Sequence, residues 1–136
     1  MLKRVAIRGF RCFDKLEIDG FSRITVVTGG NCAGKTALLE AAFLLTGRSN
    51  AEVALKLTGM RGITGYKGPP QDAHSVLWAP MFYNLDTARP IVIEGQDSSD
   101  THHKVVYSLA AEGLLTLGPA ADAARSGEST GGQRHL

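Results

Sequence analysis

The sequence predicts an α/β fold, and three consecutive stretches of the chain are the basis for this prediction. Residues 24–27 (Ile-Thr-Val-Val) form a short, β-branched, mostly apolar run, as is typical of a strand that is buried on both faces. A glycine-containing loop follows. Residues 37–45 are then apolar on nearly all sides, which indicates a buried helix, and Gly47 is placed to end that helix. The order of strand, loop and helix therefore predicts the α/β class.

The loop between this strand and helix fits the pattern G-x-x-x-x-G-K-[ST] over residues 29–36. A loop that wraps a polyphosphate turns its backbone N–H groups inward, and glycine at Gly29 and Gly34 adopts the necessary dihedral angles at low cost. The helix that begins near Gly34 adds unpaired N–H groups and the positive end of its dipole. Lys35 is expected to reach the β- and γ-phosphates, and the Thr36 hydroxyl to complete the coordination of Mg²⁺.

The sequence therefore predicts a P-loop nucleotide site with Mg²⁺ as the accompanying ion and Thr36 as its ligand. Its expected nucleotide-binding residues are Gly29, Gly30, Asn31, Cys32, Ala33, Gly34, Lys35 and Thr36. The alternative is a plain glycine-rich turn, since the chain has 16 glycines in 136 residues. The flanking strand-like and helix-like runs favour the P-loop.

Composition and charge exclude few classes of function. The chain is 43% hydrophobic and 21% charged, as in ordinary soluble proteins, and its net charge of +2 is too small to argue for nucleic-acid binding. No apolar stretch reaches the roughly 20 residues that cross a bilayer, so we expect no membrane association and a cytoplasmic protein. Cys12 and Cys32 lack a metal-binding spacing and are expected to be free thiols.

Alternation of apolar residues and turn residues predicts the remaining elements. The expected strands are residues 2–8, 16–19, 24–28, 90–94, 104–109 and 114–117, and a second helix is expected over 50–58, ending at Gly59. Residues 60–70 are expected to form an exposed loop. Residues 74–82 are ambiguous, because Trp78 and Phe82 could share a helix face despite Pro80. Residues 1–117 are expected to form one domain, and the small and polar residues 118–136 a mobile tail.

Residues 7–13, 16–18 and 24–41 together resemble the start of the ABC-type ATPases of the SMC/RecF/OLD group, often described as AAA-family ATP-binding proteins. Residues 84–86 and 90–95 are similar to a later segment of these proteins. The resemblance is specific over about the first 47 residues and loose to about residue 117. It implies a P-loop NTPase fold: the N-terminal portion of an ATPase head, with a partial ABC-ATPase-head-like sheet, a helix after the phosphate loop and an antiparallel β segment.

The resemblance also implies roles for individual residues. Asn31, Gly34, Lys35 and Thr36 would bind ATP and Mg²⁺, and Arg11 would lie near the nucleotide, with a solvated surface arginine as the alternative. Cys32 stands where the family usually has glycine, so its Cβ could crowd the loop. In full-length relatives, two heads sandwich ATP as a homodimer, commonly on DNA or in defence against phage.

Hydrolysis requires residues that the sequence does not clearly supply. The family uses a hydrophobic strand that ends in Asp-Glu, and no such strand is recognisable, so the catalytic residues are unknown. Glu94 is interpreted as an ordinary strand-end residue. Gln71 and Gln96 are candidates for a glutamine that orients water. Adjacent His102 and His103 are interpreted as part of a solvated loop rather than a metal site.

The sequence leaves several functions open. The favoured one is ATP binding by a Walker A loop within an ATPase that couples binding and hydrolysis to conformational change, in DNA repair or phage defence. The alternatives are a non-hydrolysing nucleotide-binding module and a truncated product that acts only as an interaction domain. A small P-loop kinase is disfavoured because no lid-like arginine cluster is present, and a GTPase because no N-K-x-D motif is present.

Overall fold

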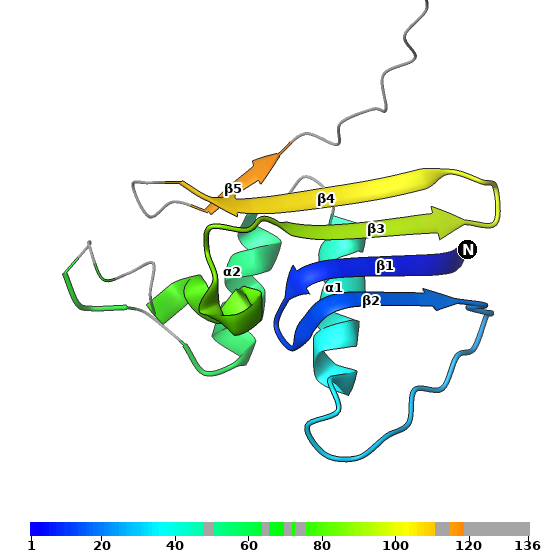
Figure 1. Ribbon diagram of the computed structural model, residues 1–136, viewed down its shortest axis with the longest axis horizontal. Coiled ribbons are helices and arrows are strands. Elements are labelled where there is room, and N and C mark those ends of the chain that lie inside the picture. The colour runs from blue at the N-terminus through cyan, green and yellow to red at the C-terminus, as the bar shows by residue number, and fades with distance from the viewer. Residues whose placement is uncertain (48–50, 64–65, 70–71, 73–75, 111–114, 119–136) are drawn as a thin grey trace, which may run out of the picture.

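A single antiparallel sheet backed by two helices makes up the computed structural model, which describes residues 1–47, 51–63, 66–69, 72, 76–110 and 115–118. The five strands lie in the order β2-β1-β3-β4-β5, and each neighbouring pair is antiparallel. Both helices, α1 and α2, lie on the same side of the sheet (Figure 1). The strands are β1 (Leu2–Phe10), β2 (Phe13–Asp19), β3 (Ile91–Asp97), β4 (His102–Leu109) and β5 (Leu115–Gly118). The helices are α1 (Lys35–Gly47), α2 (Ala51–Met60) and the short 3₁₀ segments η2 (Ala79–Met81) and η3 (Tyr83–Leu85).

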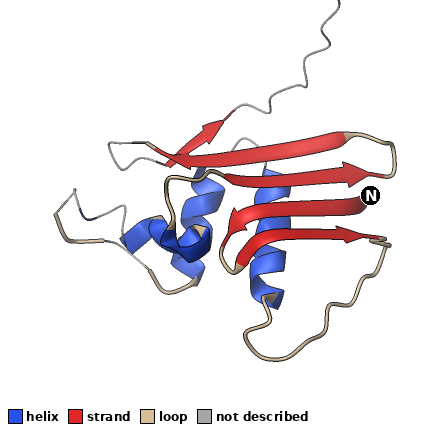
Figure 2. Ribbon diagram, in the orientation of Figure 1, coloured by secondary structure: helices blue, strands red, loops and turns tan. Residues whose placement is uncertain are grey.

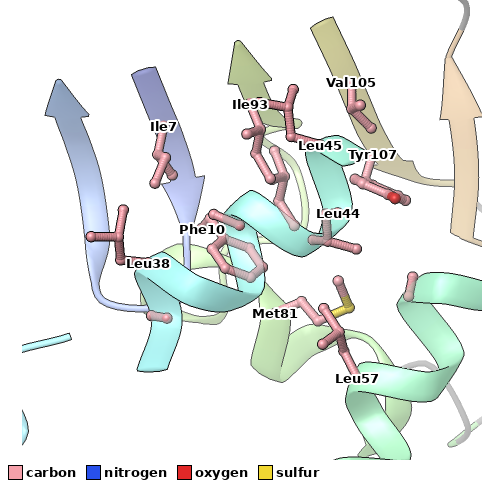
Figure 3. Packing of buried hydrophobic residues seen from close by; sticks show 14 of the residues in the cluster. Ile7, Phe10, Leu38, Leu44, Leu45, Leu57, Met81, Ile93, Val105 and Tyr107 are labelled. Atoms are coloured by element: carbon pink, nitrogen blue, oxygen red, sulfur yellow. The ribbon is translucent and has the colours of Figure 1, made fainter. Parts of the chain in front are cut away.

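The core lies between α1 and the sheet face that it covers (Figure 3). Alternate residues of the central strands point into it, and Ile7, Ile93 and Val105 form one cross-strand row, since Ile7 pairs with Ile93 and Ile93 with Val105. The inward face of α1 contributes Leu44 and Leu45, which are almost fully buried. Each such side chain contributes about 1.5–3 kcal/mol on burial. This packing fixes α1, and with it the loop at its N-terminus, against the sheet.

Most of the expected elements are confirmed, with shifted ends. The strands expected at residues 2–8, 16–19, 90–94 and 104–109 correspond to β1, β2, β3 and β4, and the helix after the loop is α1. The second helix continues to Met60, so Gly59 lies inside α2 and does not end it. The strand expected at 114–117 corresponds to β5, apart from residue 114, which lies outside the described residues, as do residues 119–136 of the expected tail.

The strand expected at residues 24–28 is wrong. This stretch is an exposed loop, in which the side chain of Ile24 is 83% exposed and that of Val26 is 79% exposed. Figure 2 shows the segment between β2 and α1 as a wide loop outside the sheet. A strand is stable only when a neighbouring strand pairs with its N–H and C=O groups, and no strand of the described chain lies beside this run. β-propensity alone therefore did not decide its structure.

The segment from Trp78 to Phe82 is not a single helix face. Pro80 lies in the first turn of η2, and Phe82 is extended, with φ −87° and ψ 142°, and forms a bridge to Phe10. The Arg11 backbone N–H donates to the Met81 carbonyl oxygen at 2.8 Å. These contacts bring η2 and η3 beside the β1–β2 turn, which is also where the loop before α1 arrives.

Candidate nucleotide-binding site

The N-terminus of α1 lies directly after the expected phosphate loop. The first hydrogen bond within the helix runs from the Leu38 N–H to the Gly34 carbonyl oxygen, at 2.9 Å. The N–H groups before Leu38 therefore have no acceptor within the helix, and they carry the positive end of its dipole. This geometry favours an anion at the start of α1.

Lys35 folds back over the loop that precedes it. Its ammonium group, Nζ, donates to the carbonyl oxygens of Gly29 at 2.7 Å and Gly30 at 2.5 Å. An anion at the helix N-terminus would compete with these neutral oxygens for the ammonium, and a charged acceptor makes roughly twice as strong a hydrogen bond. Thr36, in the first turn of α1, is exposed.

Position 34 requires glycine because of its backbone conformation and because of the side chains beside it. Its φ of +91° is one that L side chains rarely adopt, and a Cβ there would lie 2.7 Å from Cζ of Phe13 and 2.8 Å from Sγ of Cys12. The β1–β2 turn therefore packs directly against the loop. This contact explains why the motif needs glycine at this position in this chain, beyond the general requirement for a tight turn.

Arg11 is buried, so the interpretation as a solvated surface arginine is wrong. Only 10% of its side chain is exposed, and it spans from the β1–β2 turn to α1 and η2. Nε donates to Glu40 at 3.1 Å and Nη1 donates to the Pro80 carbonyl oxygen at 2.9 Å. Nη2 is buried and has no acceptor among the described residues. Burial lowers the pKa of Arg11 and Glu40 opposes this effect, but arginine remains protonated at neutral pH.

Glu40 and Arg61 complete this network, and the sequence analysis did not identify either of them. Glu40 lies on α1 with 8% of its side chain exposed, and it accepts from Arg61 Nε at 2.7 Å and Arg61 Nη2 at 3.1 Å. The hydrogen bond to Glu40 raises the pKa of Arg61. Glu40 is the one charged residue within an otherwise apolar helical run, and this was a signal that it needs a buried partner. Arg61, 21 residues away, had no comparable signal.

A cavity of about 740 Å³ lies at the junction of these elements, within the usual range for small-molecule sites of roughly 300–1,000 Å³. It brings together six of the nine predicted site residues: Arg11, Cys32, Ala33, Gly34, Lys35 and Thr36. Gly29, Gly30 and Asn31 are not part of its lining, although the two glycines hold Lys35. Pro80, Phe82, Asn84 and Leu85 form another part of the wall.

The charge of this cavity suits a polyphosphate. Arg11, Lys35 and Arg61 line it, and no carboxylate does so among the residues that the structure describes. Glu40 compensates part of this charge from behind the two arginines. The guanidinium of Arg61, the ammonium of Lys35 and the helix N-terminus are donors that match phosphate oxygens in kind.

The other candidate residues lie elsewhere. Glu94 is within β3, and its carboxylate pairs with Lys104 at 3.0 Å across the sheet. Gln96 donates to Asp100 in the hairpin. Gln71 lies outside the described residues.

His102 and His103 begin β4, so the prediction of a loop at these residues is wrong. The ring Nε2 of His103 lies 3.2 Å from Asp97 Oδ2. Within the described part of the chain, no group of three metal-ligating side chains is present, and no helix is long and apolar enough to cross a membrane.

These features define a cationic cavity at the N-terminus of a buried helix, and parts of the chain are similar to known proteins. Residues 4–60 match the family described as AAA domain. A Helicobacter pylori protein described as an ATP/GTP phosphatase is 34% identical over 113 residues, which are 82% of this chain. The matched residues make up 29% of the Helicobacter pylori protein, so this chain spans less than a third of the length of that relative. The chain is therefore similar to an AAA domain over residues 4–60 and to part of a nucleotide phosphatase over most of its length.

Proposed function

We propose that this chain binds Mg·ATP through a Walker A loop formed by Gly29 to Thr36. The observation that carries the proposal is the position of Lys35, whose ammonium lies at the N-terminus of α1 beside a cation-lined cavity of nucleotide size. A triphosphate would draw the ammonium from the Gly29 and Gly30 carbonyl oxygens and accept hydrogen bonds from the free N–H groups of the first turn. Arg11, which also lines the cavity, adds a further positive charge.

Two further residues fit the same ligand. The exposed Thr36 is placed in the first turn of α1, where its hydroxyl would hold Mg²⁺ together with phosphate oxygens and waters. The bound ion would neutralise phosphate charge. Cys32, which stands where the family usually has glycine, has a φ of +62°, in the left-handed region that favours glycine, and the residue is exposed.

We also propose that ATP binding belongs to a larger ATPase cycle of the kind that the SMC/RecF/OLD group carries out, with a homodimer of heads and DNA as candidate partners. The exposed run at residues 24–28 supports this proposal, because it has the composition of a buried parallel strand and lacks a partner among the described residues. Further strands, from beyond these residues or from another chain, would pair with it. DNA repair and phage defence are the roles that this group suggests.

Binding of Mg·ATP by the purified chain, measured by isothermal titration calorimetry, tests the first proposal. Lys35→Ala removes a charge-assisted hydrogen bond worth about 1.5–3 kcal/mol, so affinity is expected to fall roughly 10–150-fold. Lys15→Ala is the matched control, because this lysine lies on β2 with 65% of its side chain exposed. The proposal fails if the unaltered chain does not bind, or if Lys35→Ala binds as well as Lys15→Ala.

A non-hydrolysing nucleotide-binding module is the second candidate function. It is favoured because the described cavity contains no carboxylate to hold Mg²⁺ opposite Thr36. Phosphate release by the purified chain, measured with and without Lys35→Ala, separates the two. Turnover that disappears in Lys35→Ala would exclude the non-hydrolysing module. Binding without turnover would support it for this chain alone.

A further inference from the structure

Two thiols line the cavity beside the phosphate loop. Cys12 lies in the β1–β2 turn and Cys32 in the loop itself, and both are exposed and free. Sγ of Cys12 lies 2.8 Å from the position that a Cβ on Gly34 would occupy. Cys32 precedes Gly34 by two residues, and consecutive Cα atoms are about 3.8 Å apart, so the two cysteines belong to one small region of the cavity wall.

The two cysteines differ in how firmly their backbones are held. The turn that contains Cys12 is anchored by Arg11, whose backbone N–H donates to Met81 and whose side chain is buried against Glu40. All residues from 22 to 33 are exposed. The hydrogen bonds in that segment connect residues no more than six apart in the sequence. Cys32 can therefore move toward Cys12 without disturbing the core, which allows the Cα separation of roughly 4.4–6.8 Å that a disulfide needs.

The surroundings also favour thiol chemistry. Arg61 and Lys35 line the same cavity as the two cysteines, and the thiolate is the form of cysteine that reacts with oxidants. Cys12 is near enough to Arg61 to add to the raised pKa of that guanidinium, after the larger effect of Glu40. Both cysteine residues are exposed.

We propose that Cys12 and Cys32 form a peroxide-sensitive thiol pair, and that their disulfide ties the phosphate loop to the β1–β2 turn and closes the cavity to nucleotides. In the first step, one thiolate attacks hydrogen peroxide, the O–O bond breaks, and a sulfenic acid and hydroxide form; the hydroxide becomes water by taking up the proton that the thiol lost. In the second, the other thiolate attacks the sulfenic sulfur, the S–S bond forms and the S–O bond breaks, releasing a second water once protonated. In total, two thiols lose two electrons and two protons to one peroxide. The closing effect rests on the proposed function, whereas disulfide formation does not.

Peptide mapping of the oxidised full chain tests disulfide formation. Dilute protein is treated with hydrogen peroxide, alkylated, and digested with trypsin under non-reducing conditions. The expected product joins residues 12–15 to residues 24–35, the tryptic peptides that contain the two cysteines. It should disappear after dithiothreitol treatment and be absent from Cys12→Ser and Cys32→Ser. Cross-links between chains on a non-reducing gel, or oxidised cysteines without the joined peptide, would overturn the proposal.

The effect on the cavity is measured separately, by calorimetry with Mg·ATP on the reduced and the cross-linked chain. Affinity is expected to fall at least tenfold on cross-linking and to return after reduction, and saturating Mg·ATP should slow cross-linking. If the reduced chain binds ATP and the cross-linked chain binds it equally well, the closing effect is refuted and the proposed function stands. If the reduced chain does not bind ATP, the proposed function fails, while the peptide map still decides whether the thiol pair exists.

Discussion

Glu40 is the residue whose removal should most disturb the site from within the fold. Its carboxylate is 8% exposed and accepts one hydrogen bond from Arg11 and two from Arg61. Glu40→Gln keeps the shape of the side chain but removes the charge, which leaves the guanidinium of Arg11 buried without a counter-ion. Breaking a buried pair in this way costs about 3–5 kcal/mol.

The lower end of that range applies here. Arg61 has 41% of its side chain exposed, so it can recover solvation when Glu40 is lost, and its part of the network is discounted. Arg11 also retains its hydrogen bond to the Pro80 carbonyl oxygen. We therefore expect Glu40→Gln to lower the free energy of unfolding by about 3 kcal/mol, which corresponds to a fall in Tm of roughly 10 °C for a domain of this size.

Urea denaturation, monitored by circular dichroism, measures this loss as a shift of the unfolding midpoint with an unchanged m-value. Glu52→Gln is the matched control, because its partner Lys56 lies at 3.5 Å with both side chains more than half exposed, and it should cost no more than about 1 kcal/mol. Replacing the buried charges together, as Arg11→Met with Glu40→Leu, should cost less than the sum of the single changes. A loss below 1 kcal/mol for Glu40→Gln would refute the description of this network as a buried, charge-compensated unit.

Three further predictions concern the loop and the sheet. Gly34→Ala should lower the free energy of unfolding by about 1–3 kcal/mol and weaken nucleotide binding, because Gly34 has a positive φ and a Cβ would meet two side chains. Gly30→Ala should change stability little, because the space around Gly30 is open. Comparison of the urea midpoints of the two variants tests this prediction. Ile24→Thr combined with Val26→Thr should leave the chain's stability within about 0.5 kcal/mol, and a larger loss would indicate that the run is buried as a strand. Hydrogen bonds from Ser99 and Thr101 lower the pKa of Asp97. The stabilising effect of the Asp97 carboxylate is therefore complete above the unfolded-state pKa of about 4 and is lost as the pH falls below that value. Asp97→Asn should flatten the acidic part of the plot of stability against pH, and an unchanged plot would contradict the hairpin geometry.

How far the sequence predicted the structure depended on whether the signal was local. β3 and β4 were predicted from apolar, β-branched runs whose residues alternate in burial, and β1 from a partial alternation, although Val5, Ala6 and Ile7 are all buried. α1 was predicted because nearly all its sides are apolar. The candidate phosphate loop at residues 29–36 was predicted from its residue spacing together with the flanking runs. In contrast, the run at 24–28 had a strong local signal and still did not form a strand, because pairing depends on a neighbour that a local pattern does not contain.

The sequence by itself determined the local features of the candidate site: a lysine and a hydroxyl at the start of a buried helix, preceded by a glycine-containing loop. The tertiary structure decided what surrounds that point. Folding places Arg11 and Arg61 on one carboxylate of α1 and sets Cys12 against Gly34, although these residues are far apart in the chain. No pattern in the sequence encodes these distances, since they arise only when α1 packs on the sheet and the β1–β2 turn, η2 and the end of α2 converge at its N-terminal half.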